Sequence, residues 1–336
     1  MPASREDCVL ADGRMTDRRA LLGALAGAAA VGASGRALAQ AYPARPVTLI
    51  VPYAPGGASD ALGRLIAGPL GSLGQQVVVE NRPGAGTLAG AQAVARAEAN
   101  GYTLLLATST TLAINASLYP KLPYDPVKDF APVSLVAEVP FVLIVAPSVK
   151  ATTLAELVAL SKGTSLSYGS AGNGSPHHLF MELLKARTGL VATHVPYRGS
   201  APAINDVVGG QTQLMFADLA PAQAQIEGGT IRALAVSTAA RLPSLPQVPT
   251  AAEAGVPGYE ATAWQGVVGP KGLPGDIVAR LDAAIARAVA EPETASRLRA
   301  AGLVPLHRGP AEFAALVQSE IGKWARVVEA SGAKVD

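Results

Sequence analysis

The sequence predicts an α/β protein of two lobes, in which each lobe holds a mainly parallel sheet flanked by helices. Short β-branched or leucine-rich runs alternate with segments of helical periodicity over much of the 336 residues. Glycine, proline and small polar residues separate these runs, as is typical of turns between strands and helices. The length is that of about two domains.

Residues 1–39 are predicted to be a secretory signal peptide. Arg18 and Arg19 precede a short apolar run over 20–34, and small residues up to Ala39 form a cleavage site. The run is shorter than the roughly 20 residues that a spanning helix needs, which disfavours a membrane anchor. General secretory and twin-arginine export both stay open. We therefore expect a soluble protein of the periplasm.

Composition excludes several classes of protein. The single cysteine, Cys8, lies in the predicted leader, which rules out disulfide frameworks, iron–sulfur clusters and cysteine-rich zinc sites. A formal charge of +2 without a basic patch disfavours nucleic-acid binding. Only 4% of the residues are aromatic, and only four are histidines. We expect no cofactor, no metal and no catalytic residues.

The first lobe is predicted to begin with a β-α-β-α-β pattern, which indicates a parallel sheet. Strands are expected over 47–53, 77–79 and 102–107. Ser59 is the expected cap of the first helix, and Pro69 should kink or shorten that helix.

Further strands are expected over 133–137, 141–146, 166–170, 194–197, 214–217, 231–237 and 260–269, with closing helices near 275–290, 293–301 and 310–330. The last three helices have no predicted strand of their own, so we place them on the first sheet. Lobe 1 is then 45–138 plus 268–336, and lobe 2 is 139–267. Two crossings, near 138–142 and 264–268, would form a hinge.

Four polar loops follow predicted strands and precede helices. In parallel sheets, ligands bind beyond the carboxyl ends of the strands, where helix N-termini favour anions. Ordinary strand–helix turns are the alternative for each loop. The loops are Pro55–Asp60, Ser109–Asn115, Ser170–Ser175 and Tyr197–Ser200.

Two other sites are alternatives to such a ligand cleft. Ser175 and His178 could form the core of a hydrolase, although no nucleophile-elbow motif is present. We expect His177 to be solvated and His178 to be buried or on the cleft wall. Gly84–Gly90 resembles a dinucleotide fingerprint, but tight packing of a helix on the sheet explains these glycines at least as well.

Five ordered motifs resemble the Bug family, the substrate-binding proteins of tripartite tricarboxylate transporters. The resemblance covers essentially all of 43–336. The motifs are Tyr53-Ala-Pro-Gly-Gly-Ala-Ser-Asp60, Val79-Glu-Asn-Arg-Pro-Gly-Ala-Gly86, Tyr168-Gly-Ser170 with Gly172-x-Gly-Ser-x-x-His-Leu179, Val195-Pro-Tyr-Arg-Gly199 and Pro249-Thr-x-x-Glu-x-Gly255.

This resemblance implies a two-lobed periplasmic binding protein, a monomer that closes like a Venus flytrap on a small carboxylate. The ligand would be a dicarboxylate, a tricarboxylate, an acidic amino acid or an aromatic acid, and a membrane permease would receive it. A sensor that presents its closed form to a membrane kinase is the alternative. The implied ligand-binding residues are Tyr53, Pro55, Gly56, Gly57, Ala58, Ser59, Asp60, Ser109, Thr110, Ser170, Ala171, Gly172, Asn173, Ser175, His178, Tyr197, Arg198, Gly199 and Asp218.

Overall fold

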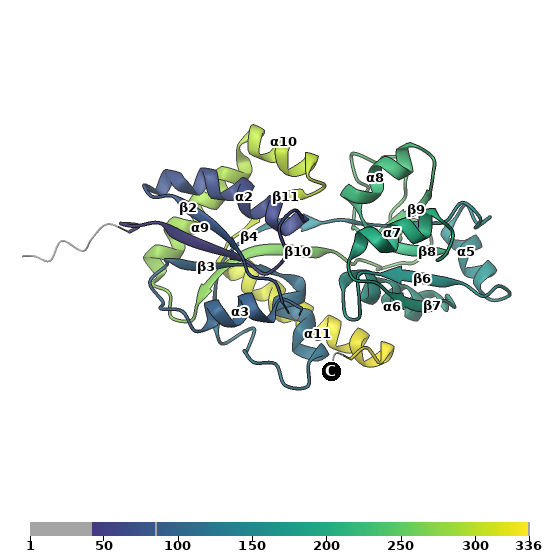
Figure 1. The fold of residues 1–336 in the computed structure, drawn as a ribbon, viewed down its shortest axis with the longest axis horizontal. Coiled ribbons are helices and arrows are strands. Elements are labelled where there is room, and N and C mark those ends of the chain that lie inside the picture. Colours follow the sequence, from purple (N-terminus) through teal and green to yellow (C-terminus); the bar gives the residue numbers. More distant parts are fainter. Residues whose placement is uncertain (1–41, 85, 335–336) are drawn as a thin grey trace, which may run out of the picture. The chain divides into compact units, whose positions relative to one another are not determined.

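The computed structural model describes residues 42–84 and 86–334. The predicted signal peptide, 1–39, lies outside the described residues. Residues 43–336 form one compact unit that contains two separate sheets (Figure 1). None of the described helices is both long enough and apolar enough to cross a bilayer.

The first sheet has six strands in the order β11-β4-β10-β3-β1-β2. Its β1, β2 and β3 pair in parallel, as the β-α-β-α-β pattern predicts. The remaining pairs, which involve β10, β4 and β11, are antiparallel. The strands are β1 (Val47–Val51), β2 (Val77–Asn81), β3 (Thr103–Thr108), β4 (Phe130–Val139), β10 (Ala263–Pro270) and β11 (Val304–Arg308).

The second sheet has five strands in the order β7-β6-β8-β5-β9. Its β6 pairs in parallel with β7 and β8, whereas β5 is antiparallel to both β8 and β9. All five residues of β5 are buried. The strands are β5 (Phe141–Val145), β6 (Ser167–Ser170), β7 (Thr193–Pro196), β8 (Leu214–Asp218) and β9 (Arg232–Val236).

The two-lobed α/β fold is confirmed, but the sheets are mixed rather than mainly parallel. Pro140 alone separates β4 in the first sheet from β5 in the second. The chain returns to the first sheet along β10, which lies beside β4 and must run in the opposite direction. The crossings therefore introduce the antiparallel pairs that the alternating sequence pattern did not reveal.

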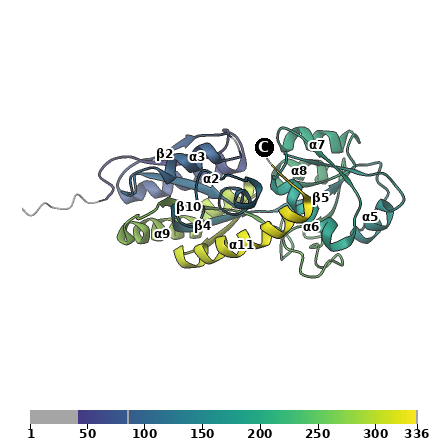
Figure 2. The same cartoon turned by 90° about the horizontal axis from the view of Figure 1, so that it is seen from below.

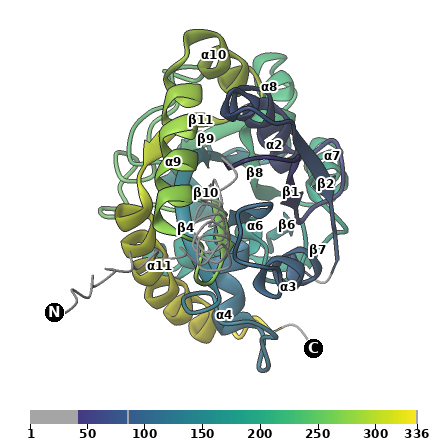
Figure 3. The same cartoon turned by 90° about the vertical axis from the view of Figure 1, so that its left-hand side faces the viewer.

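Helices flank both sheets, and the C-terminal helices return to the first one (Figures 1 and 3). Helix α9 packs on β4 and α2, while α6, α7 and α8 pack on β8. The helices are α2 (Ala58–Leu70), α3 (Leu88–Ala95), α4 (Asn115–Leu118), α5 (Leu154–Ser161), α6 (Pro176–Thr188), α7 (Ser200–Val208), α8 (Leu219–Glu227), α9 (Gly275–Ala290), α10 (Pro292–Ala300) and α11 (Pro310–Ser331), with a short 3₁₀ turn at Gly71–Leu73 and a π-helical turn at Thr110–Ile114.

Helix α11 contacts elements of both lobes (Figure 2). It packs on β4, and its Trp324 stacks on Phe180 of α6 with 5.3 Å between ring centroids. Buried Glu320 accepts hydrogen bonds from the indole N–H groups of Trp324, at 2.7 Å, and of Trp264 in β10, at 3.4 Å. Lys323 completes this cluster with an ion pair to Glu320 at 3.0 Å. One carboxylate thus ties α11 to the strand that returns from the second sheet.

Several local predictions need correction. Gly57, not Ser59, is the N-cap of α2, and Pro69 lies in the last turn of that helix, which ends one residue later. Strand β11 has no counterpart among the predicted strands, because it is a half-exposed edge strand that contains Pro305 and shows no clear alternation. The packing interpretation of Gly90 fits the structure, because a Cβ there would lie only 2.9 Å from Pro52.

Candidate functional site

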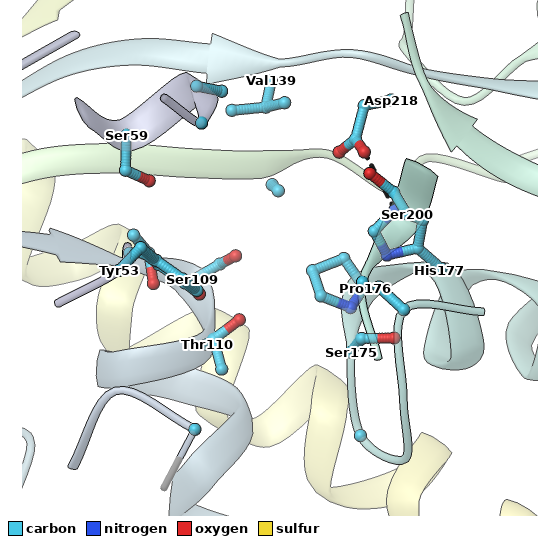
Figure 4. Close-up of a pocket in the computed structure, with 18 of the residues that line it drawn as sticks. Tyr53, Ser59, Ser109, Thr110, Val139, Ser175, Pro176, His177, Ser200 and Asp218 are labelled. Atoms are coloured by element: carbon cyan, nitrogen blue, oxygen red, sulfur yellow. Dashed lines mark hydrogen bonds and ion pairs between the residues drawn. The ribbon is translucent and has the colours of Figure 1, made fainter. Parts of the chain in front are cut away.

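A cavity of about 760 Å³ lies where the chain crosses between the sheets. Its floor includes Val139 and Phe141, on either side of Pro140, and the start of β10. Side chains from the first sheet's loops face those from the second across this cavity (Figure 4). The lining residues are Tyr53, Ala54, Pro55, Gly57, Ala58, Ser59, Gly86, Thr108, Ser109, Thr110, Asn115, Leu118, Tyr119, Val139, Phe141, Ala171, Asn173, Gly174, Ser175, Pro176, His177, Gly199, Ser200, Asp218, Ala263, Trp264 and Gln265.

The N-caps of four helices line this one cavity. Gly57, Ser175, Gly199 and Asp218 precede α2, α6, α7 and α8 respectively. The first N–H groups of a helix have no partner within the helix, and the N-terminal end of its dipole is positive. Convergence of these helix starts makes the cavity suited to an anion.

The loop from Tyr53 to Asp60 is held from behind by side chains of its own lobe. Asn81 donates to the Tyr53 carbonyl and to Asp60, both at 3.0 Å, and Arg64 pairs with the same Asp60 carboxylate. The hydrogen bond from Arg64 is the main reason that the pKa of Asp60 is lowered. The Gly56 N–H also donates to Asp60, at 3.0 Å. Gly56 and Asp60 therefore shape the loop and do not line the cavity.

A pair of stacked histidines supports the opposite loop, 171–175. The rings of His178 and His194 lie parallel with 3.9 Å between centroids. His178 Nδ1 accepts from the Gly174 N–H at 3.1 Å, and His194 Nε2 lies 2.6 Å from the Ser170 hydroxyl. That hydroxyl also accepts from the Gly172 N–H. The structure thus places Ser170, Gly172 and His178 behind the cavity wall.

The expectation for the neighbouring histidine was wrong. His177 is not solvated but only 6% exposed, and it lines the cavity. Adjacent residues of a helix face different directions, so α6 presents His177 to the cavity and His178 to the stack. Tyr197 also lies outside the cavity lining, and its hydroxyl donates to Asp206 at 2.5 Å. The neighbouring Arg198 is exposed and does not line the cavity either.

His177 and Asp218 form a polar pair on the second lobe's wall. His177 Nε2 lies 3.1 Å from Asp218 Oδ2, and the Ser200 hydroxyl is a further partner of the carboxylate (Figure 4). Burial acts to raise the pKa of Asp218, but the contacts with His177 and Ser200 outweigh burial and lower it. Asp218 is therefore a carboxylate at neutral pH.

The facing wall carries hydroxyl groups. Burial raises the pKa of the Tyr53 phenol, and hydrogen bonds with Thr108 and Thr110 only partly oppose that rise. Ser109 and Thr110 line the cavity, as the resemblance implied. The other implied residues that line it are Tyr53, Pro55, Gly57, Ala58, Ser59, Ala171, Asn173, Ser175, Gly199 and Asp218.

Unpaired polar atoms concentrate at this cavity. Among the described residues, five buried side-chain atoms have no hydrogen-bond partner. Four of these atoms belong to residues that line the cavity, namely Ser109, Asn115, His177 and Gln265. A buried polar atom without a partner costs about 1–3 kcal/mol, so such atoms point to a functional site.

Sequence reasoning did not assign His177 or the floor residues Val139, Phe141 and Gln265 to the site. The floor residues lie in strands whose sequence resembles ordinary buried core. Only their position at the two crossings that form the expected hinge could indicate them.

The Ser175 hydroxyl is not arranged as a hydrolase nucleophile. It donates to the Gly172 carbonyl at 2.7 Å and accepts from the backbone N–H of His178. The His178 ring nitrogen Nδ1 is bonded to Gly174 instead of Ser175. The pair therefore caps a helix and shapes a loop, which is a structural arrangement.

Comparison with known proteins identifies relatives of the whole fold. Residues 64–333 match the TctC family, described as tripartite tricarboxylate transporter family receptors. Protein BugT of Bordetella pertussis is 39% identical over 311 residues, which cover 91% of this chain and 95% of that protein. A second relative, from Pseudomonas sp. strain P51, is described as a protein in the tcbD–tcbE intergenic region. It is also 39% identical, and the match covers 93% of this chain and 94% of that protein.

Solved structures show the same similarity. Rpa4515 of R. palustris with adipate is 39% identical with a TM-score of 0.79, and the match covers 88% of this chain and all of that one. MatC of Rhodopseudomonas palustris with bound malate is 36% identical, with a TM-score of 0.75 over 85% of this chain and all of that one. The periplasmic binding protein BugD is 34% identical with a TM-score of 0.75, and the match covers 88% of this chain and all of that one.

The stacked histidines predict loss of stability in acid. Burial, with a smaller contribution from the neighbouring His178, lowers the pKa of His194 to about 3. The unfolded chain, with a histidine pKa of about 6.5, binds more protons between these two values, so the free energy of unfolding should fall as pH decreases from about 6.5 toward 3. We expect the melting temperature of wild type to fall more steeply over this window than that of His194→Gln. Parallel curves would contradict this role of the stack.

Gly174 predicts a steric test of the approach between the two walls. A Cβ at Gly174 would lie 2.1 Å from Leu118 of the facing lobe, whereas one at Gly189 would meet no atom within 4 Å. Both glycines have nearly the same positive φ, +71° and +70°, so alanine introduces similar backbone strain at either position. We expect Gly174→Ala to weaken ligand binding at least about tenfold, a change of 1.4 kcal/mol. Gly189→Ala should lower the melting temperature and leave affinity for the ligand unchanged. Equal affinities of the two variants would show that the close contact between Gly174 and Leu118 is irrelevant to binding.

Proposed function

Because the chain belongs to the TctC family of tripartite tricarboxylate transporter receptors, we propose that it captures a small carboxylate in this cavity and delivers it to a membrane permease. The observation that carries the proposal is the convergence of four helix N-caps on one cavity. Adipate and malate accompany two related structures, which supports a small carboxylic acid as the ligand.

Backbone N–H groups at Ala58 and Ser59, at the start of α2, would hold the carboxylate. No lysine or arginine is among the described residues that line the cavity, so helix starts are the source of positive potential there. Hydroxyls of Ser109 and Thr110 would bind the rest of the ligand. Some of the ligand-binding residues that the resemblance implies lie behind the cavity walls. These residues would act by positioning the loops that line the cavity.

Ligand binding would favour a closed arrangement of the lobes. The proposed hinge consists of the crossings near 138–142 and 264–268, where Pro140 and Trp264 lie. A ligand that contacts both walls binds the closed state better and so shifts the population toward it. The receptor would act in the periplasm as a monomer after removal of 1–39. Presentation of the closed form to a sensor kinase requires the same closure and is the second candidate.

A thermal-shift screen tests carboxylate capture. We expect at least one dicarboxylate, tricarboxylate, amino acid or aromatic acid to raise the melting temperature, because a ligand that binds only the folded state stabilises it. At a ligand concentration of 100 times Kd the stabilisation is about 2.7 kcal/mol. The absence of any shift with every class of acid would overturn the proposed function.

Gly57 offers a matched pair of variants for the anion site. Its φ of −87° is ordinary for any residue, and a Cβ there would meet no atom within 4 Å. Asp and Asn are equally good N-caps, so both variants should fold. We expect Gly57→Asp to abolish carboxylate binding by charge repulsion, while Gly57→Asn retains more affinity. Similar affinities for the two would place the carboxylate elsewhere.

A further inference from the structure

Asp218 occupies an N-cap position without acting as one. An aspartate before a helix usually accepts hydrogen bonds from the first N–H groups of that helix. Asp218 precedes α8, yet its side chain makes no cap hydrogen bond. Its carboxylate is directed instead to His177 on α6, 3.1 Å away, and to the Ser200 hydroxyl on α7. Residues of three helix starts thus hold one carboxylate at the cavity wall.

The charge of this wall is unusual for a site that receives an acid. Asp218 is the only acidic residue among the described residues that line the cavity, and no lysine or arginine lines it. A dicarboxylate would place its second negative charge in the same cavity as Asp218, and like charges in a partly desolvated site repel strongly. A positive group on the ligand would remove this repulsion and neutralise Asp218.

His177 is arranged to hold Asp218 and to leave one acceptor unused. When its Nε2–H donates to Asp218 Oδ2, the other nitrogen, Nδ1, carries a lone pair. That Nδ1 is buried without a hydrogen-bond partner, and His177 as a whole is only 6% exposed. The carboxylate of Asp218 and the Nδ1 atom are both hydrogen-bond acceptors, so this pair offers no donor to a second carboxylate.

We propose that the ligand is an amino acid whose protonated amine, at the end distant from the captured carboxylate, pairs with Asp218. His177 is then a positioning residue that orients Asp218. This inference rests on the proposed function, because it assumes that the helix starts hold the carboxylate. It assigns the end of the ligand at the second lobe's wall, which the start of α2 in the first lobe leaves undefined.

Matched ligands of equal length separate the chemistries. Isothermal titration calorimetry would compare 5-aminopentanoate, glutarate, 5-hydroxypentanoate and pentanoate, with the three-, four- and six-carbon counterparts as a length series. We expect an amino acid to bind at least about tenfold more tightly than the dicarboxylate of the same length. A dicarboxylate that binds more tightly at every length, or a hydroxy acid that equals the amino acid, would overturn the proposal.

Asp218→Asn keeps the size of the side chain and removes its charge. In this variant the preference for the amine should fall at least about tenfold, and affinity for the dicarboxylate should rise. Asp206→Asn is the matched control, since Asp206 lies outside the cavity lining, where it accepts from Tyr197; its ligand preference should equal that of wild type. An unchanged preference in Asp218→Asn would overturn the pairing.

The outcomes also separate this inference from the proposed function. Binding of dicarboxylates without binding of amino acids would refute the amine site and leave carboxylate capture intact. Failure of every acid in the series and in the wider screen would refute both.

Discussion

The one-residue link between β4 and β5 is the constraint on which the cavity depends. Because only Pro140 separates the strands, the end of β4 in the first sheet meets the start of β5 in the second at this point. Val139 and Phe141 then face the same cavity from opposite sides of the link, and the start of β10 lies beside them. Loops at the adjoining ends of the two sheets are thereby brought to one place, although more than a hundred residues separate Gly57 from Ser175 and Gly199.

The walls of the cavity are built in two layers. Glycine, alanine and hydroxyl-bearing residues make up most of its lining, while polar and aromatic groups behind them fix the loop conformations. Asp60 and Asn81 serve this purpose in the first lobe, and His178 and His194 do so in the second. The motif at Pro249 has a similar structural basis, because Thr250 and Glu253 bond to each other reciprocally.

Much of the fold could be predicted because its periodicities are local. The strand–helix alternation located most elements, and α6 begins after Ser175 and ends before Gly189, residue types that are typical of helix caps. The antiparallel pairs of β4 and β10 could not be predicted, since nothing in a strand's own residues specifies its neighbour. The same reason applies to the cavity. Polar loops were recognisable one by one, but the different directions of His177 and His178 depend on how α6 packs, which is a tertiary property.

The cluster around Glu320 has a consequence for observing this protein. The chain has two tryptophans, and both indoles donate to that carboxylate. Trp264 lines the cavity, while Trp324 lies against Phe180 of the opposite lobe. The tryptophan fluorescence of the molecule therefore originates at the junction of the lobes, within one hydrogen-bonded cluster. The two tryptophans are therefore an intrinsic fluorescent probe of the place where the cavity, β10 and α11 meet.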